Sequence, residues 1–257
     1  MTKLDYIEEN VTLLHGDCLD RLKELNDNSV DLVFTSPPYN MRLRVRNGEY
    51  TEREKGEHFS KKYEFFSDAL GIEEYYNNQK QIIEEMLRIS KIVLYNIQIV
   101  TGSKEALFRL IGHFNKEIKD IIIWDKGHGQ PSINEKVLNK ATEMIIIFEQ
   151  NATSGRKIEN CYFERGTLAD IWRIKRERNE FSNEHSAVFP MKLVKKILMN
   201  FSEEGDTILD PFMGTGTTGI GCLDMKRKFI GIELTEEYFK ISKDRMMNRV
   251  FISDLVE

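Results

Sequence analysis

The chain has 257 residues, and its 42 acidic and 37 basic side chains give a net charge of −5. With 40% hydrophobic and 31% charged residues, the composition is that of a globular protein, and it excludes collagen-like and wholly disordered chains. No apolar run approaches the ~18 residues of a membrane span, and residues 1–10 lack the apolar core of a secretory signal. We therefore expect a cytoplasmic protein without a membrane partner.

Apolar periodicity predicts strands and helices that alternate along the chain. In chain order we expect a strand at 11–14, a helix at 18–25, a strand at 30–34, a helix at 75–89, a strand at 92–95, a helix at 105–114, strands at 121–124 and 144–148, a helix at 188–201 with Pro190 in its first turn, a strand at 207–209, a helix at 217–225, a strand at 229–232 and a helix at 236–248. Strands rich in β-branched residues and separated by helices predict an α/β fold, with a mostly parallel sheet covered by helices on both faces.

The placement of cysteine and histidine argues against a disulfide framework and against a metal site. Cys18, Cys161 and Cys222 are odd in number, lie far apart and form no C-x-x-C pair. The five histidines are scattered and form no H-E-x-x-H motif. We expect no metal.

Two segments interrupt the alternation of strands and helices. Residues 41–66 and 151–184 have no sustained period and exceed ordinary α/β connections, which indicates functional insertions into a single domain spanning residues 1–257. They overlap two basic stretches, 41–62 and 155–178, each with seven basic and four acidic residues. These stretches are candidate phosphate-facing surfaces, although charge runs of this kind are most often solvated loops.

A glycine-rich turn follows an apolar strand near the C-terminus and opens a helix. Its pattern, Gly214-x-Gly216-x-x-Gly219, with Glu233 at the tip of the next strand, matches the dinucleotide fingerprint. Only 38 residues follow Gly219, too few for a complete dinucleotide fold, and the carboxylate of Asp210 would repel a pyrophosphate. The cationic amino-acid end and the ribose of S-adenosylmethionine (SAM) suit this turn better. Tight packing of strand and helix is the alternative explanation of the glycines.

The most specific motif is Thr35-Ser-Pro-Pro-Tyr39, directly after the strand at 30–34. Proline fixes its own φ and holds the preceding residue extended, so the carbonyl groups around Ser36 and Pro37 become rigid acceptors. Tyr39 adds a flat aromatic face beside them. The motif predicts a site for a planar group that bears an NH₂. A rigid turn with Tyr39 in the core is the alternative.

Together, Thr35–Tyr39 and Leu209-Asp-Pro-Phe-Met-Gly-Thr-Gly216 resemble the motifs of amino-methylating DNA methyltransferases, which modify cytosine N4 or adenine N6 in restriction–modification systems. The Pro-Pro motif precedes the glycine-rich turn, as in the β group of that family, and the resemblance extends over residues 11–245. It implies a circularly permuted, Rossmann-like SAM-dependent methyltransferase fold with a seven-stranded sheet, in which N-terminal strands complete the C-terminal cofactor half.

The resemblance also implies roles for individual residues. The catalytic group is Ser36, Pro37, Pro38 and Tyr39: Ser36 Oγ and the Pro37 carbonyl accept both N–H groups of the target amine, and Tyr39 stacks on the flipped base. The cofactor residues are Asp17, Cys18, Thr35, His185, Ser186, Asp210, Phe212, Gly214, Gly216, Thr217, Thr218 and Glu233. DNA contacts are expected from Arg42, Arg44 and Arg46 in the active-site loop, and from Trp172, Arg173, Lys175, Arg176 and Arg178 in the candidate target-recognition region.

Double-stranded DNA is the implied partner, with a cognate restriction endonuclease and a second copy of the chain as further candidates. None of the three cysteines follows a proline, so the Pro-Cys nucleophile of cytosine C5 methylation is absent. Serine at position 36 favours cytosine N4. Adenine N6 enzymes more often carry Asp or Asn there and remain the alternative. A nucleotide-dependent oxidoreductase and a non-catalytic SAM- or DNA-binding module are the remaining hypotheses.

Overall fold

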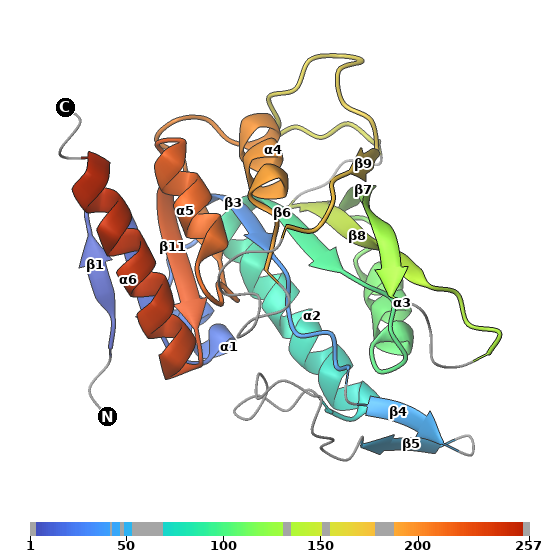
Figure 1. Ribbon diagram of the computed structural model, residues 1–257. Coiled ribbons are helices and arrows are strands. Elements are labelled where there is room, and N and C mark those ends of the chain that lie inside the picture. The colour runs from blue at the N-terminus through green and yellow to red at the C-terminus, as the bar shows by residue number, and fades with distance from the viewer. Residues whose placement is uncertain are drawn as a thin grey trace.

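The computed structural model describes residues 4–41, 43–46, 49–52, 69–130, 135–150, 155–177 and 188–253. A nine-stranded mixed sheet runs through these residues in the order β1-β2-β11-β10-β3-β6-β8-β7-β9 (Figure 1). Its strands are β1 (Tyr6–Glu8), β2 (Val11–His15), β3 (Val30–Thr35), β6 (Ser90–Ile97), β7 (Ile118–Gln130), β8 (Lys140–Glu149), β9 (Ile171–Arg173), β10 (Thr207–Asp210) and β11 (Lys228–Glu233). A separate two-stranded hairpin consists of β4 (Leu43–Arg46) and β5 (Glu49–Glu52).

The centre of the sheet is parallel and joins the two ends of the chain. Strand β11 pairs with β2, β10 pairs with both β11 and β3, and β3 pairs with β6, all in parallel. The C-terminal β10–helix–β11 unit therefore lies between N-terminal strands, and the permuted order predicted from the sequence is confirmed. The carboxyl ends of these strands meet at one edge, where His15 lies in register with Glu233.

The prediction of a seven-stranded, mostly parallel sheet is wrong, because nine strands are present and the pairings β1–β2, β6–β8 and β7–β8 are antiparallel. Strands β7 and β8 form a hairpin because no helix separates them, and a parallel pairing needs a long crossover connection. The unforeseen edge strands β1 and β9 have three residues each. Such short segments do not show a strand period in the sequence.

Helices cover both faces of the sheet, as predicted (Figure 1). One face carries α1 (Cys18–Lys23), α2 (Ile72–Ile89) and α3 (Lys104–His113), and the other carries α4 (Met191–Phe201), α5 (Thr217–Asp224) and α6 (Glu236–Ser253). Each face has its own core, with Leu22 and Ile83 in the first and Leu198 and Phe239 in the second. Within the described ranges, no helix is long and apolar enough to cross a membrane.

Helix α4 begins at Met191 rather than at Val188. Pro190 is not in its first turn but occupies the position before it, with a ψ of 136°. That extended backbone is incompatible with a helical residue, so the predicted start was too early.

The described part of the second insertion, residues 155–177, packs against the sheet instead of forming a detached loop. Glu149 ends β8, is buried, and accepts the backbone N–H of Asn160 at 2.8 Å. Strand β9 then adds to the sheet edge by pairing in parallel with β7. The first insertion contributes the β4–β5 hairpin, and its residues 42, 47–48 and 53–66 lie outside the described ranges.

Candidate active site

The two sequence motifs meet at the carboxyl edge of the parallel strands. Thr35 ends β3, Asp210 ends β10 and Glu233 ends β11. Thr35 Oγ1 donates to Asp210 Oδ1 at 2.8 Å, and Gly16, just after β2, donates its N–H to the Glu233 carbonyl at 3.0 Å. Open α/β sheets bind their ligands outside this edge. The fold therefore brings the Pro-Pro motif and the glycine-rich turn to one place.

Asp210 is enclosed by hydrogen bonds from its neighbours. Besides Thr35, it accepts the hydroxyl of Thr218 at 2.8 Å and the backbone N–H of Phe212 at 3.1 Å, and it is 3% exposed. Burial raises the pKa of Asp210 to about 6, although these hydrogen bonds act in the opposite direction. The carboxylate thus ties the Pro-Pro strand to the first turn of α5. Three predicted cofactor residues, Thr35, Phe212 and Thr218, act on it here.

Two of the motif glycines are needed for packing. Gly216 has a φ of +79°, and a Cβ there would lie 2.6 Å from Cε of Met246 on α6. A Cβ at Gly219 would lie 2.3 Å from the same atom. The packing explanation therefore holds for these two. Gly214 instead donates its N–H to Glu233 Oε2 at 3.0 Å and links the turn to β11.

The groups around the turn fit a cofactor with an amino-acid end and a ribose. Helix α5 starts without a side-chain cap, and Thr217 Oγ1 in its first turn is buried and has no hydrogen-bond partner among the described residues. A carboxylate satisfies both. Glu233 is half-buried, and burial raises its pKa. Beside it in the sheet, Nε2 of His15 is also buried without a partner in the described part of the chain. These donors and acceptors match SAM.

The predicted N-terminal cofactor residues lie next to this turn. Asp17 caps α1, and its Oδ1 accepts the N–H groups of Leu19 at 2.9 Å and Asp20 at 3.2 Å. Cys18 is 7% exposed, and burial, together with the charges of Asp17 and Asp210, raises the pKa of its thiol well above the ordinary value. Cys18 is therefore an apolar contact rather than a thiolate. The predicted cofactor residues His185 and Ser186 lie outside the described residues.

A hydrogen-bond network beside the Pro-Pro motif ends on a buried carboxylate. Ser36 Oγ and Tyr39 OH are 2.8 Å apart, and Tyr39 OH donates to Glu143 Oε2 at 2.9 Å. Asn96 Nδ2 donates to Tyr39 OH at 2.7 Å and to Glu143 Oε2 at 2.6 Å. Lys126 Nζ lies 2.7 Å from Glu143 Oε1, and these two side chains are 2% and 7% exposed. The predicted catalytic serine and tyrosine are thus connected to a buried ion pair.

The surroundings set the charges of this network. Burial raises the pKa of Glu143, but Lys126, Asn96 and Tyr39 outweigh it and hold the pKa below its ordinary value. Burial, followed by the charge of Glu143, raises the pKa of Tyr39 well above its ordinary value. At neutral pH, Glu143 is therefore a carboxylate and Tyr39 a neutral phenol.

Hydrogen bonds also hold the backbone of the motif. Tyr75 on α2 donates its hydroxyl to the Pro38 carbonyl at 2.9 Å. Asn40 is buried, has a φ of +57°, and donates from Nδ2 to the Leu70 carbonyl at 2.9 Å. The Pro-Pro segment is thus anchored on one side by Thr35 and on the other by Asn40.

Sequence reasoning missed Asn40, Tyr75, Asn96 and Glu143. A signal was present for two of them. Asn96 and Glu143 are polar residues inside or beside apolar strand segments, where an unpaired polar side chain is costly, so a partner was to be expected.

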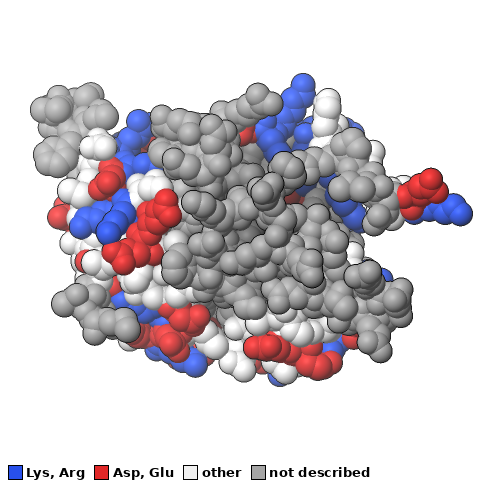
Figure 2. Space-filling view, turned by 60° about the horizontal axis from the view of Figure 1, so that its bottom comes forward, with Lys and Arg blue, Asp and Glu red and all other residues white. Residues whose placement is uncertain are grey.

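The basic residues predicted to contact DNA lie in two places. Arg176 is half-exposed, and its NH2 group lies 3.4 Å from Glu143 Oε1. Arg44 and Arg46 are two positions apart on β4 and so share one face of a strand, in a hairpin beyond the carboxyl end of β3 (Figure 1). Arg42 and Arg178 lie outside the described residues. Among the described residues in Figure 2, basic and acidic side chains are interspersed.

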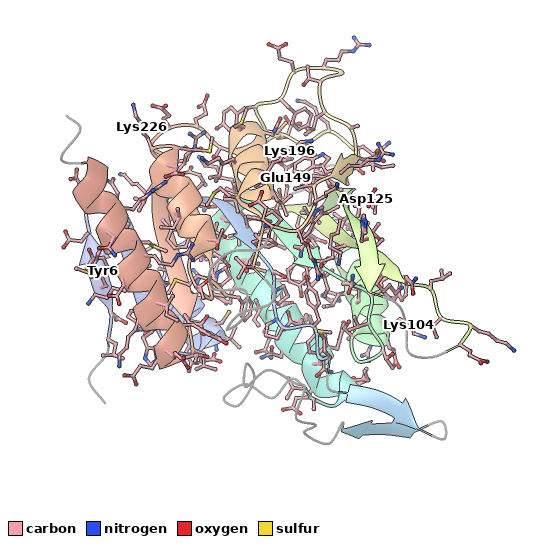
Figure 3. The ribbon with its side chains drawn as sticks, in the orientation of Figure 1. Tyr6, Lys104, Asp125, Glu149, Lys196 and Lys226 are labelled. Carbon is pink, nitrogen blue, oxygen red and sulfur yellow. The ribbon has the colours of Figure 1, made fainter. Side chains whose placement is uncertain are left out.

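Trp172 is a core residue, which contradicts the prediction that it contacts DNA. It is 1% exposed, and Nζ of Lys196 on α4 lies 4.3 Å from its ring centroid (Lys196 is labelled in Figure 3). Burial alternates along this segment: Trp172 and Ile174 are buried, whereas Arg173 and Lys175 are exposed. The strand period therefore turns the aromatic ring inward and the two basic side chains outward.

Comparison with known proteins identifies the family. Residues 30–244 match the family model described as DNA methylase, N6_N4_Mtase. The chain belongs to this family. It is 28% identical over 261 residues to the Type II methyltransferase M2.LlaDCHI of Lactococcus lactis subsp. cremoris, over 96% of this chain and 93% of that protein. It is also 28% identical over 267 residues to the DNA adenine methyltransferase YhdJ of Escherichia coli (strain K12), over 93% of this chain and 83% of that protein.

Solved structures share the fold. The PvuII DNA methyltransferase (cytosine-N4-specific) superposes with a TM-score of 0.67 at 20% identity, over 93% of this chain and 86% of that one. A DNA modification methylase of Thermus thermophilus, TTHA0409, in complex with S-adenosyl-L-methionine, superposes with a TM-score of 0.63 at 21% identity, over 93% of this chain and 95% of that one.

The resemblance drawn from the two motifs is thus confirmed. The chain is a DNA amino-methyltransferase of restriction–modification type, and its cofactor is SAM. The matches include both an adenine enzyme and a cytosine-N4 enzyme, so family membership alone does not fix the target base.

Proposed function

We propose that the protein methylates the N4 amine of cytosine at a specific site in double-stranded DNA. The observation that carries this proposal is a serine at position 36, whose hydroxyl stands at the head of the network through Tyr39 to Glu143. When bound, SAM supplies its sulfonium methyl group: the S–C bonding electrons stay on sulfur, and the amine nitrogen, once bonded to the methyl carbon, loses one proton to water.

The chain's own residues bind and orient the amine. Its nitrogen is a poor nucleophile because the lone pair is delocalised into the base ring. Acceptance of both N–H groups, by Ser36 Oγ and the Pro37 carbonyl, favours a pyramidal nitrogen and stabilises the positive charge that develops on it. The ring of Tyr39 stacks on the base after it has left the helix. The anchors at Thr35 and Asn40 keep these acceptors in place.

The residues that would hold SAM are those at the carboxyl edge. The uncapped start of α5 and the Thr217 hydroxyl suit its carboxylate, and Glu233 suits its ribose diol. The negative charge of Asp210 favours its cationic end. The predicted roles of His185 and Ser186 in closing this site remain part of the proposal.

The two insertions supply the DNA contacts in this proposal. Arg44 and Arg46 share a face of β4 and suit a phosphate backbone, and the exposed Arg173 and Lys175 suit phosphates and base edges. A net charge of −5 requires that basic residues gather on one face. A partner endonuclease, a second copy of the chain and action in the cytoplasm are further proposals, supported by the restriction–modification relatives.

Adenine N6 is the alternative target, and the adenine-specific relative YhdJ supports it. Purified protein, SAM and DNA of mixed sequence should yield N4-methylcytosine on digestion to nucleosides and mass spectrometry. N6-methyladenine as the sole product would replace cytosine by adenine. SAM binding without any methylated nucleoside would instead indicate a non-catalytic module. Sequencing of the modified DNA then reads the recognition site.

A further inference from the structure

The ion pair beside the Pro-Pro motif determines the direction in which the motif's hydrogen bonds run. Glu143 on β8 faces Lys126 on β7 at 2.7 Å, and Arg176 adds a second cation at 3.4 Å. Both cations favour the ionised carboxylate, which has no hydrogen to give and can only accept. Tyr39 OH, 2.9 Å from Glu143 Oε2, must therefore donate its single hydrogen to Glu143.

The other members of the network follow from that assignment. The Tyr39 oxygen has only lone pairs left for its remaining neighbours. Ser36 Oγ, 2.8 Å away, must donate to one of them, and Asn96 Nδ2, 2.7 Å away, donates to the other. The amide of Asn96 is held in this orientation because its contact of 2.6 Å with Glu143 Oε2 requires an NH₂ group. The same orientation leaves Asn96 Oδ1 buried with no partner among the described residues.

Ser36 consequently meets the substrate with its hydrogen already in use. Its lone pairs accept a hydrogen bond from an exocyclic amine, but they repel a carbonyl oxygen at the same ring position. We propose that Glu143, acting through Tyr39, fixes Ser36 as an acceptor and so makes the site reject target bases that carry a carbonyl in place of the amine. Glu143 is then a positioning residue that sets specificity, an inference that rests on the proposed function.

The principal test is Tyr39→Phe, which removes the hydroxyl between Ser36 and Glu143 but keeps the ring that stacks. Ser36 is then free to rotate and to donate. Binding is measured to duplexes that carry either the target base or its carbonyl analogue, uracil for cytosine or hypoxanthine for adenine. The mismatch eases flipping equally for both proteins, so the compared quantity is the ratio of the dissociation constants, carbonyl over amino. We expect the variant's ratio to fall by at least about tenfold, with kcat lowered and SAM affinity unchanged.

A matched control and a second variant isolate the effect. Tyr95 is buried, and its hydroxyl donates to Gln79 Oε1 at 2.7 Å outside this network, so Tyr95→Phe should keep the wild-type ratio. The double variant Glu143→Gln with Lys126→Met removes both buried charges together. Its glutamine amide can donate to Tyr39 and so reverse the chain of donors, and the ratio should fall here as well. Circular dichroism establishes that each variant folds.

The outcomes separate this inference from the proposed function. No methyl transfer by the wild-type protein to any DNA would overturn the proposed function itself. Methyl transfer by the wild type, with an unchanged ratio in the folded Tyr39→Phe and double variants, would overturn the role of Glu143 alone. An equal fall of the ratio in Tyr95→Phe would also overturn it, because any lost buried hydroxyl would then suffice.

Discussion

The hydroxyl of Thr35 donates a hydrogen bond to the carboxylate of Asp210 at 2.8 Å, across 175 positions of sequence. Thr35 immediately precedes the Ser-Pro-Pro-Tyr segment, and Asp210 immediately precedes the glycine-rich turn. The contact joins the amine-binding and cofactor-binding halves of the site without an intervening residue. Because Asp210 is buried in making it, the contact also has a consequence for pH.

Asp210 should make the protein less stable as the pH rises. Burial raises its pKa from 3.8 to about 6, so the folded state favours the protonated carboxyl, and that stabilisation is lost as the pH rises through about 6. Asp210→Asn should abolish this dependence and gain about 3 kcal/mol on the wild type between about pH 4 and about pH 7. Urea denaturation over this range measures it. Parallel stability curves for the two proteins would contradict the expectation.

Glu233→Ala should weaken SAM binding by roughly 1–3 kcal/mol. The change removes the expected ribose acceptor and frees the N–H groups of Gly214 and Thr235, which Glu233 now accepts. Calorimetric titration with SAM measures the loss. Glu236→Ala is the matched control, because Glu236 is an exposed carboxylate paired with Lys240 on the same side of the chain. Equal affinities in wild type and Glu233→Ala would remove Glu233 from the cofactor site.

Ser36→Ala should lower turnover on the order of 10²-fold while leaving SAM and DNA affinity nearly unchanged. Alanine keeps the backbone of the motif but takes away one of the two acceptors of the target amine. Single-turnover methyl transfer at saturating DNA and SAM is the measurement. Ser29→Ala, which removes a hydroxyl bonded to the Asn26 carbonyl in an exposed turn, should behave as wild type. Wild-type turnover in folded Ser36→Ala would end the catalytic assignment.

The buried pair of Lys126 and Glu143 should show strong coupling in stability. Lys126→Met alone leaves a carboxylate buried without its main cation and should cost about 3–5 kcal/mol. Adding Glu143→Gln removes the second charge and should restore most of that loss. Guanidinium unfolding of the wild type, both single variants and the double variant completes the cycle. Additive losses would show that the pair is not coupled.

The triple change Arg42→Gln, Arg44→Gln and Arg46→Gln should weaken binding to all DNA sequences alike. Each arginine that leaves a phosphate lowers the slope of log affinity against log salt by about one unit. Filter binding over a salt series measures the slope. Changes at Arg173 and Lys175 should also alter site preference, because base edges are among their expected contacts.

Two lysines provide the control for this charge change. Lys226 and Lys228 are exposed at the amino end of β11, opposite the site edge, so changing both to Gln should keep the wild-type slope (Lys226 is labelled in Figure 3). A wild-type slope in the triple arginine variant would mean that residues 42–46 do not touch DNA.

The sequence by itself determined the features that depend on short segments. The strands, the helices and the permuted order follow from local periodicity and from the order of two motifs. The rigidity of the Ser36–Tyr39 segment follows from the fixed φ of proline. The acceptor chemistry and the cofactor class were predictable because Pro37 and Asp210 carry them in their immediate surroundings.

Tertiary structure alone decided what depends on residues brought together from distant strands. The antiparallel direction of β7 and β8 shows in their pairing, and Trp172 lies in the core although its neighbours in sequence are basic. Glu143 reaches Tyr39 across 104 positions. Whether Ser36 donates or accepts depends on that carboxylate, because a hydroxyl alone can do either. Hydrogen-bond direction is a property of the assembled network, so local sequence does not contain it.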